Sequence, residues 1–127
     1  MSGVYFLPAN SQEINFGDLI LPQSISYENC SRVFNTDNVT LLHLTVSAVN
    51  ANRFKIIEVQ SNSGFILFTA AGKQFLASVS NVNTNQGMLK ITPADGNYYF
   101  QPGIITNIFK YIDMNVSKKP EIINLSY

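Results

Sequence analysis

The segment N-V-T-L-L-H-L-T-V-S-A-V-N, residues 38–50, decides the fold that this sequence predicts. Its even positions from Thr40 to Ala48 are mostly apolar, whereas its odd positions include polar residues such as His43. Successive side chains of a strand point to opposite faces, so this pattern predicts a strand with one face in a core. We expect the chain to turn at residues 50–52 and to return as a second strand over residues 53–60, which are rich in aromatic and β-branched side chains.

Other short apolar or β-branched runs follow the same plan and are separated by turns rich in Asn, Gly and Pro. They predict strands over residues 4–7, 13–21, 24–34, 65–69, 74–79, 88–92 and 98–101. The run 65–69 is apolar on both faces, which predicts a strand covered on both sides. Residues 104–116 have apolar side chains at helical spacing, but their β-branched content favours a strand.

Together these elements predict an all-β fold. The expected architecture is an antiparallel β-sandwich, in the form of a single jelly roll of about eight or nine strands. A chain of 127 residues has the usual size of one domain. We therefore expect a single domain over residues 1–127, in which residues 117–127 form a C-terminal tail or arm.

The tail is the candidate interface with other subunits. Lys118, Lys119 and Pro120 are followed by a mainly apolar run. Unless something covers them, its large apolar side chains would stay exposed and promote aggregation. The sequence therefore predicts that a neighbouring subunit binds the side chains of Ile122, Ile123, Leu125 and Tyr127, with the tail acting as an added strand.

The charge of the chain argues against nucleic acid as a partner. Eight basic and eight acidic side chains cancel, and no basic run is longer than Lys118-Lys119. A nucleic-acid-binding protein carries a basic patch that neutralises phosphates. Charged residues make up 13% of the chain, compared with about a quarter in a typical domain. A neutral, amide-rich surface suits association with copies of the chain or with neighbouring structural proteins.

The sequence shows no signal for export or membrane insertion. The apolar run at the N-terminus ends at Pro8 and has no basic region before it, so we expect no signal peptide. The longest apolar stretches are far shorter than the roughly 20 residues that cross a bilayer. Cys30 is the only cysteine, which excludes an internal disulfide and favours an intracellular folding compartment.

Catalytic and metal-binding patterns are missing from the sequence. His43 is the only histidine, and the eight carboxylates are scattered singly. Cys30 and His43 could act as nucleophile and base if the fold joined them, but a lone cysteine is more commonly a small buried apolar residue. No nucleotide-binding glycine motif or calcium loop is present. We therefore expect no enzymatic activity and no cofactor.

One cluster supports a ligand-binding alternative. Aromatic rings pack on the apolar faces of sugars while amides and carboxylates bind the hydroxyl groups. Tyr98 and Tyr99 beside Asp95 and Asn97 could form such a platform, together with the Asn-rich loop 80–87. Because neighbouring strand residues point to opposite faces, only some of these rings can share a surface. The alternative function is thus a carbohydrate- or receptor-binding β-sandwich module, either cytoplasmic or exported by a non-classical route.

The run A-A-G-K-Q-F, residues 70–75, lies between two predicted strands of a neutral, amide-rich β chain. In this it resembles the small single jelly-roll vertex proteins of tailless, membrane-containing phages. The resemblance implies a capsid role without catalysis, in which the chain ends grip neighbouring subunits. Our leading expectation is a non-enzymatic structural subunit of a larger assembly, such as a viral capsid, vertex or decoration protein. It would be made in the host cytoplasm and located in the virion.

The N-terminal run G-V-Y-F-L-P-A-N, residues 3–10, is similar to the opening of a family of small bacterial calcium-dependent lectins that bind fucose and mannose. That resemblance implies a sugar-binding β-sandwich. The family's cluster of closely spaced Asp and Asn near the C-terminus is absent, since Asp113 and Asn115 stand almost alone. We therefore expect no calcium-dependent sugar site.

Overall fold

The structure is a computed structural model that describes residues 19–116. Within these residues seven strands form two antiparallel sheets, a pair β1–β7 and a five-stranded sheet in the order β2-β6-β5-β4-β3. In chain order the elements are β1 (Gln23–Ser24), the 3₁₀ helix η1 (Tyr27–Cys30), β2 (Ser31–Phe34), α2 (Asn38–Ala51), β3 (Lys55–Gln60), β4 (Phe65–Ala70), β5 (Lys73–Asn83), β6 (Gln86–Pro93), β7 (Tyr99–Phe100) and α3 (Gly103–Val116).

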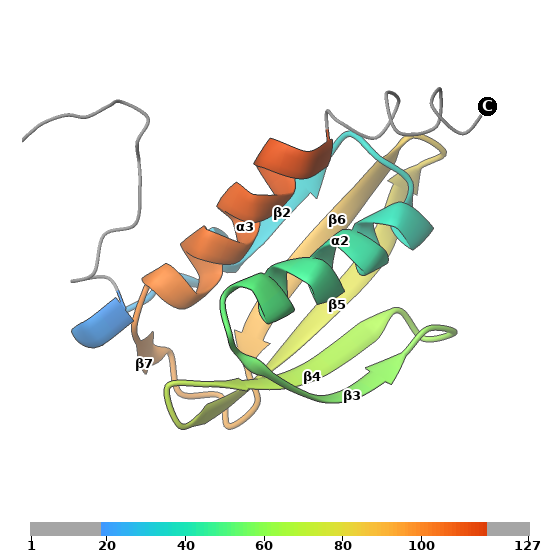
Figure 1. The fold of residues 1–127 in the computed structure, drawn as a ribbon. Helices are drawn as coiled ribbons and strands as arrows, with labels where there is room; N and C mark the ends of the chain where they lie inside the picture. Colours follow the sequence, from blue (N-terminus) through green and yellow to red (C-terminus); the bar gives the residue numbers. More distant parts are fainter. Residues whose placement is uncertain (1–18, 117–127) are drawn as a thin grey trace, which may run out of the picture.

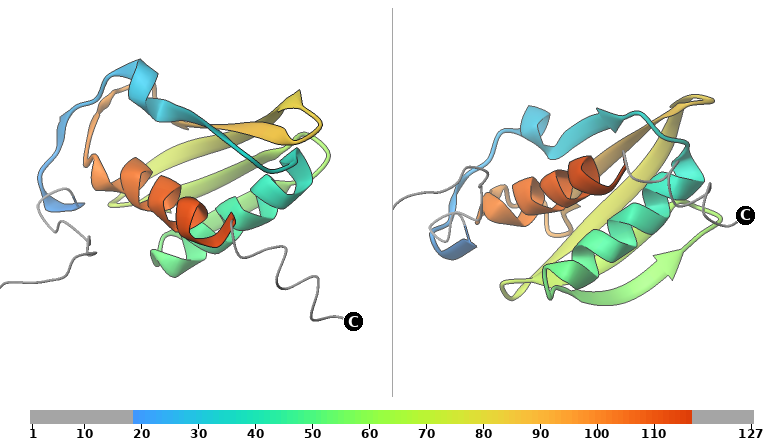
Figure 2. Two further views of the ribbon diagram at one scale, coloured as in Figure 1. Left: turned by 90° about the horizontal axis from the view of Figure 1, so that it is seen from above. Right: turned by 45° about the horizontal axis from the view of Figure 1, so that its top comes forward.

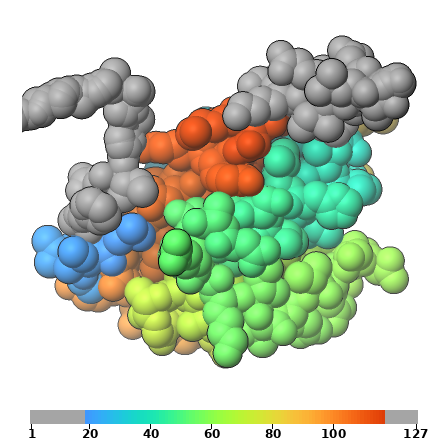
Figure 3. All heavy atoms as spheres, viewed as in Figure 1, coloured from blue at the N-terminus to red at the C-terminus, as the bar shows by residue number. Residues whose placement is uncertain are grey.

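The two helices lie side by side on one face of the large sheet (Figures 1 and 2). In the space-filling view of this side, α2 lies between α3 and the edge formed by β3 and β4 (Figure 3). Apart from η1, which contacts β6 near the β2 edge, no described helix or strand packs on the opposite face of the sheet. We call that side the open face; it bears the side chains of alternate strand residues, which are partly exposed along β4, β5 and β6.

Consecutive hairpins build the middle of the sheet. Leu67 lies opposite Leu76 in the β4–β5 pair, and Ser78 lies opposite Lys90 in the β5–β6 pair. The β4–β5 connection consists of Ala71 and Gly72, both with positive φ (52° and 76°). Two such residues form the kind of tight turn whose twist matches that of a hairpin. The run A-A-G-K-Q-F thus has a local role in forming this hairpin.

The strand predicted for residues 38–50 is wrong, because these residues form helix α2. The buried side chains are those of Leu41, Leu42, Thr45, Ala48 and Val49, which recur at helical spacing. The hydroxyl of Thr45 donates a hydrogen bond to the carbonyl of Leu41 at 2.7 Å, so its burial leaves no polar group unsatisfied. Alternation and helical spacing overlapped in this segment, and packing against the sheet selected the helix.

The strand favoured for residues 104–116 is also wrong. These residues belong to helix α3, whose buried side includes Ile104, Ile105, Ile108, Phe109 and Ile112. Intervals of three and four residues place these side chains on one face of a helix. β-branched side chains lower helix propensity by only a few tenths of a kcal/mol each, about what one buried methyl group offsets. Burial against the sheet therefore decides the conformation.

The prediction of antiparallel β structure is confirmed, whereas the all-β class is wrong because of α2 and α3. Predicted strands at 53–60, 65–69, 74–79, 88–92 and 98–101 overlap β3, β4, β5, β6 and β7. A jelly roll has a second β-sheet facing the first, and in the described residues helices occupy that place. The strand predicted at 4–7 and most of that at 13–21 lie outside the described residues, as does the tail 117–127.

One continuous cluster of buried side chains joins both helices to the sheet. Its aromatic part is a row of rings, in which Phe75 contacts Phe68 at a centroid distance of 5.6 Å and Phe100 at 5.0 Å. Phe54, which follows α2, stacks on Phe68 at 6.0 Å. The row joins the residue after α2 to the central strands and to β7. Because β7 directly precedes α3, these contacts hold the start of α3 against the sheet.

We expect Gly64→Ala to destabilise the fold more than Gly96→Ala. Both glycines have positive φ (73° and 75°), a conformation that costs other residues about 1–2 kcal/mol. A Cβ at residue 64 would also lie 2.9 Å from the carbonyl oxygen of Val79, whereas a Cβ at residue 96 would meet nothing within 4 Å. Thermal or urea unfolding should show that Gly64→Ala lowers the free energy of unfolding by about 2–4 kcal/mol and that Gly96→Ala lowers it by about 1 kcal/mol. Equal losses would contradict the close approach at Gly64.

Candidate interaction surfaces

The open face carries large apolar side chains at its centre. Phe65, Leu67 and Leu76 project from β4 and β5, and each is partly exposed. Met88 on β6 lies opposite Val33 on β2, and Val33 is 42% exposed. Residues 65–69 were predicted to be covered on both sides, and in the described residues only the side bearing Ile66 and Phe68 is covered. The apolar composition of the other side is the sequence signal for this surface.

Polar side chains border the apolar centre of the open face. Ser78, Lys90 and Thr92 continue the face across β5 and β6, while Lys55 and Glu58 lie on the edge strand β3. The surface therefore has an apolar centre and a rim with charges of both signs. This is the general layout of a protein–protein interface.

An aromatic cluster borders the same face near η1. The ammonium group of Lys90 donates a hydrogen bond to the hydroxyl of Tyr27 at 2.9 Å, and the ring of Tyr27 packs edge-on against Tyr98 at 6.0 Å. The hydrogen bond and the charge of Tyr27 raise the pKa of Lys90 above its ordinary value. Burial is the largest cause that raises the pKa of Tyr98, and the nearby Cys30 is the second. Both groups are already protonated at neutral pH at their ordinary pKa values of 10.5 and 10.0, so the upward shifts leave their charges at that pH unchanged.

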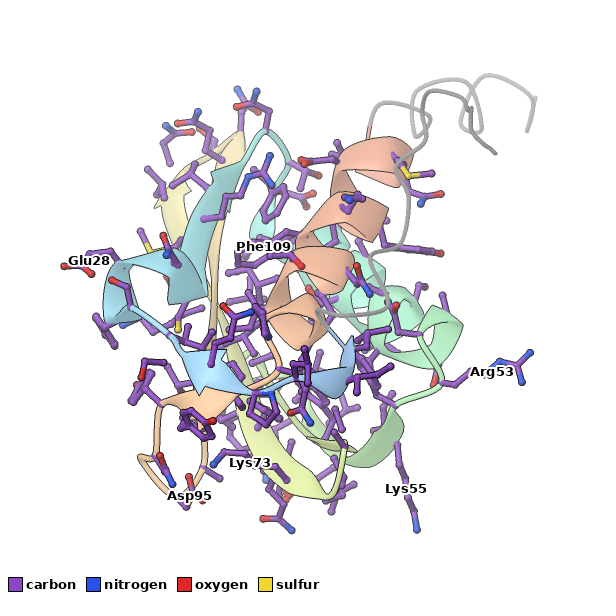
Figure 4. The ribbon with its side chains drawn as sticks, turned by 90° about the vertical axis from the view of Figure 1, so that its left-hand side faces the viewer. Glu28, Arg53, Lys55, Lys73, Asp95 and Phe109 are labelled. Atoms are coloured by element: carbon purple, nitrogen blue, oxygen red, sulfur yellow. The ribbon has the colours of Figure 1, made fainter. Side chains whose placement is uncertain are left out.

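The four residues predicted as a ligand platform lie close together in the chain, but the polar side chains of two of them, Asp95 and Asn97, already have partners. Asp95 forms an ion pair with Lys73 at 3.1 Å, and its other oxygen accepts the backbone N–H of Asn97 at 2.9 Å (Figure 4). The side chain of Asn97 accepts the backbone N–H of Tyr99 at 3.2 Å. Tyr98 is half-buried, and Tyr99 is 56% exposed. The ring of Tyr99 is thus the part of this platform best placed to meet a ligand.

The prediction of a loop over residues 80–87 is wrong, because these residues form the ends of β5 and β6 and the short turn between them. This Asn-rich turn lies at the far end of β5 from Phe75, which contacts the neighbour of Tyr99, Phe100. The turn is held by hydrogen bonds from Asn83 to Gln86 and from Gln86 to Asn35, each 2.9 Å long. β5 separates the two ends by 11 residues, which is about 36 Å of extended strand. The predicted combination of the tyrosines with this loop in one site is therefore wrong for a small ligand.

An open hollow of about 720 Å³ lies beside the Asn-rich turn. Side chains with amide, hydroxyl and carboxylate groups line it, together with Val116 at the end of α3, and its surface is about equally polar and apolar. The lining residues are Asn35, Thr36, Asp37, Asn83, Asn85, Gln86 and Val116. Such a wall offers both hydrogen-bond donors and acceptors to a neutral polar ligand.

A smaller and more enclosed cleft of about 320 Å³ lies between η1, β2 and α3. Phe109 is placed there between α3 and β2 (Figure 4). The guanidinium of Arg32 is 2.6 Å from the carboxylate of Asp113 and 5.2 Å and 5.9 Å from the rings of Phe34 and Phe109. Sequence reasoning missed this cleft, because its walls come from segments about 70 residues apart that only the tertiary fold brings together.

The other residues considered from the sequence do not form a reactive centre in the described part of the chain. Cys30 is fully buried, and burial raises the pKa of its thiol. His43 is exposed on α2, and no hydrogen bond joins it to Cys30. Residues 19–116 contain no group of three or more His, Cys, Asp or Glu side chains that could hold a metal ion. The candidate interface residues Ile122, Ile123, Leu125 and Tyr127 lie outside the described residues.

Comparison of the chain with protein-family models and with curated proteins found no match. None of the helices described for residues 19–116 combines the length and the apolar character that crossing a membrane requires. The function therefore has to be inferred from the surfaces themselves.

We expect the carboxyl group of Asp95 to titrate below its ordinary pKa of 3.8, chiefly because it accepts the N–H of Asn97 and secondly because of Lys73. A lowered pKa means that this carboxylate favours folding above its unfolded pKa, and that the contribution is lost as the pH falls through the lowered value. NMR titration of the carboxyl carbon should show that Lys73→Gln removes only the smaller part of the shift. Complete loss of the shift in that variant would contradict this order.

Proposed function

We propose that this chain is a non-enzymatic structural subunit of a larger assembly, and that its open face binds a second copy of the chain. The observation that carries the proposal is the partly exposed apolar centre that Phe65, Leu67 and Leu76 form on β4 and β5, away from the edge where η1 contacts β6. Contiguous apolar surface of this kind marks sites of protein association.

The size of the open face supports a contact between subunits. The face is five strands wide, with a spacing of about 4.8 Å between strands, and about six residues long, with a rise of about 3.4 Å per residue. These dimensions give an area of about 490 Å². Two such faces together bury about 1,000 Å², which is near the lower limit for a specific interface. Charges of both signs on the rim, from Lys55 and Glu58, allow a copy related by two-fold symmetry to pair opposite charges.

A viral capsid, vertex or decoration protein is the particular assembly that we propose. Support comes from the zero net charge and the amide-rich composition, which suit close packing of identical subunits. The resemblance of residues 70–75 to phage vertex proteins lends only small support, because these residues form a common hairpin turn. Electron microscopy of particles from the natural source, with antibody labelling of this chain, tests the capsid form.

Leu67→Lys should weaken self-association at least tenfold, because it places a charge at the centre of the proposed interface. The variant should fold, since Lys at 67 would lie opposite Glu58 on the neighbouring strand. Asn50→Lys adds the same charge on exposed α2 and should leave association unchanged. Sedimentation velocity over a range of concentrations measures the effect. A wild-type protein that stays monomeric, or equal behaviour of both variants, would refute the proposal.

A carbohydrate- or receptor-binding module is the second candidate. Two observations favour it: the exposed ring of Tyr99, and the amide-lined hollow beside Asn83 and Asn85. Because these features lie at opposite ends of β5, a small glycan would occupy one of them and not both.

On a glycan array, the second candidate predicts specific binding by the wild-type protein. If the Tyr99 ring forms the site, Tyr99→Ala should reduce binding at least tenfold while Asn85→Ala leaves it unchanged; a site in the hollow reverses this pattern. Both residues are exposed, so neither change should unfold the protein. The absence of binding across the array would exclude the glycan form of this candidate.

A further inference from the structure

The cleft lies at the edge of the sheet, beside Ser31 and Arg32 at the start of β2. β2 is the last strand of the large sheet, and no described strand pairs with its outer edge. Beside that edge, Ile25, Ile105 and Phe109 contribute apolar walls to the cleft of about 320 Å³. At about 30 Å³ per molecule it would hold roughly ten waters against these walls. A side chain that replaced this water would be bound by the hydrophobic effect.

The rim of the cleft has a small excess of negative charge. Arg32 is neutralised by Asp113, and Glu28 in η1 remains as the charged group beyond this pair. The carboxylate of Glu28 accepts a hydrogen bond from the hydroxyl of Ser26, which lowers its pKa and keeps it ionised. A segment that carries basic residues next to apolar ones therefore suits this cleft.

The C-terminal tail is the segment of this chain that matches these requirements. In an extended strand, residues 121–127, E-I-I-N-L-S-Y, would place Ile123, Leu125 and Tyr127 on one face, with Glu121 at its start, and Ile122 on the other. Lys118 and Lys119, which precede this segment by one residue, supply two positive charges, and Glu121 within it supplies one negative charge, so the side chains of residues 118–127 have a net charge of +1. The N-terminal residues 1–18 contain two acidic residues and no Lys or Arg, so they fit the rim less well.

We propose that residues 121–127 of a second copy add as a strand to the edge of β2 and insert Ile123, Leu125 and Tyr127 into the cleft. The inference rests on the assembly role proposed above, which requires a contact between subunits. Eleven residues after Val116 span up to about 36 Å, whereas the four residues of β2 need about 13 Å. The tail can therefore leave its own α3 and still cover the β2 edge of a neighbour.

Two variants separate the tail from the cleft. Truncation after Lys119 removes the proposed strand and leaves the cleft open. Thr106→Trp leaves the tail intact and fills the cleft, since Thr106 is exposed on α3 and lines the cleft. His43→Trp introduces the same side chain at an exposed position of α2 that does not line the cleft, and serves as the control.

Sedimentation velocity should show association weakened at least tenfold in the truncated chain and in Thr106→Trp, and unchanged in His43→Trp. A mixture of the first two should associate more tightly than either alone, because the tail of Thr106→Trp can enter the cleft of the truncated chain. Unchanged association in both variants would overturn the inference while leaving the open face as the interface. Weakening without rescue in the mixture would indicate that the tail binds its own chain, and would also overturn it.

A point variant of the tail guards against misfolding of the truncated chain. Leu125→Asp places a charge on the face that would enter the cleft, while Asn124→Asp adds the same charge to the opposite face. Only Leu125→Asp should weaken association, by at least tenfold. Equal effects of the two variants would contradict insertion of this face. A monomeric wild-type protein would refute the assembly role itself, which is a different result.

Discussion

The burial of one side of the five-stranded sheet by α2 and α3 is the constraint on which the rest of the structure depends. Phe68, Phe75 and Ile91 on the sheet and Val49 and Ile108 on the helices are all fully buried in a single cluster. Truncation of one buried Phe typically costs about 3–5 kcal/mol, a large share of the 5–15 kcal/mol that usually stabilises a domain. Removal of either helix would expose this surface to water.

The two sides of the sheet differ in how much the burial of their apolar side chains contributes to folding. On the helix side, apolar residues are buried and contribute to folding. On the open face, Phe65, Leu67 and Leu76 contribute less to folding because they keep contact with water. Antiparallel sheets can expose one face, but that face is then usually polar. The apolar centre of the open face departs from this rule, and this departure is the ground on which we propose association.

The cleft and the open face adjoin the same strand, β2, from different sides. Arg32 and Phe34 point toward α3, while Ser31 and Val33 belong to the open face. A strand added at this edge would extend both the core and the open face, because its alternate side chains would continue both surfaces. Contacts at the edge and on the face could thus reinforce each other in an assembly.

Local chemistry let the sequence alone determine the hairpins and much of the strand pattern. Gly64, Gly72 and Gly96 mark turns whose positive φ few other residues accept, and short apolar or β-branched runs lie between them. Only the tertiary structure decided that residues 38–51 and 103–116 are helices. The apolar residues of the first segment fit both periods and the β-branched residues of the second favoured a strand, but burial against the sheet selects the helix in both. The tertiary structure also decided which face stays open and where η1, β2 and α3 form a cleft, since these depend on contacts between residues far apart in the chain.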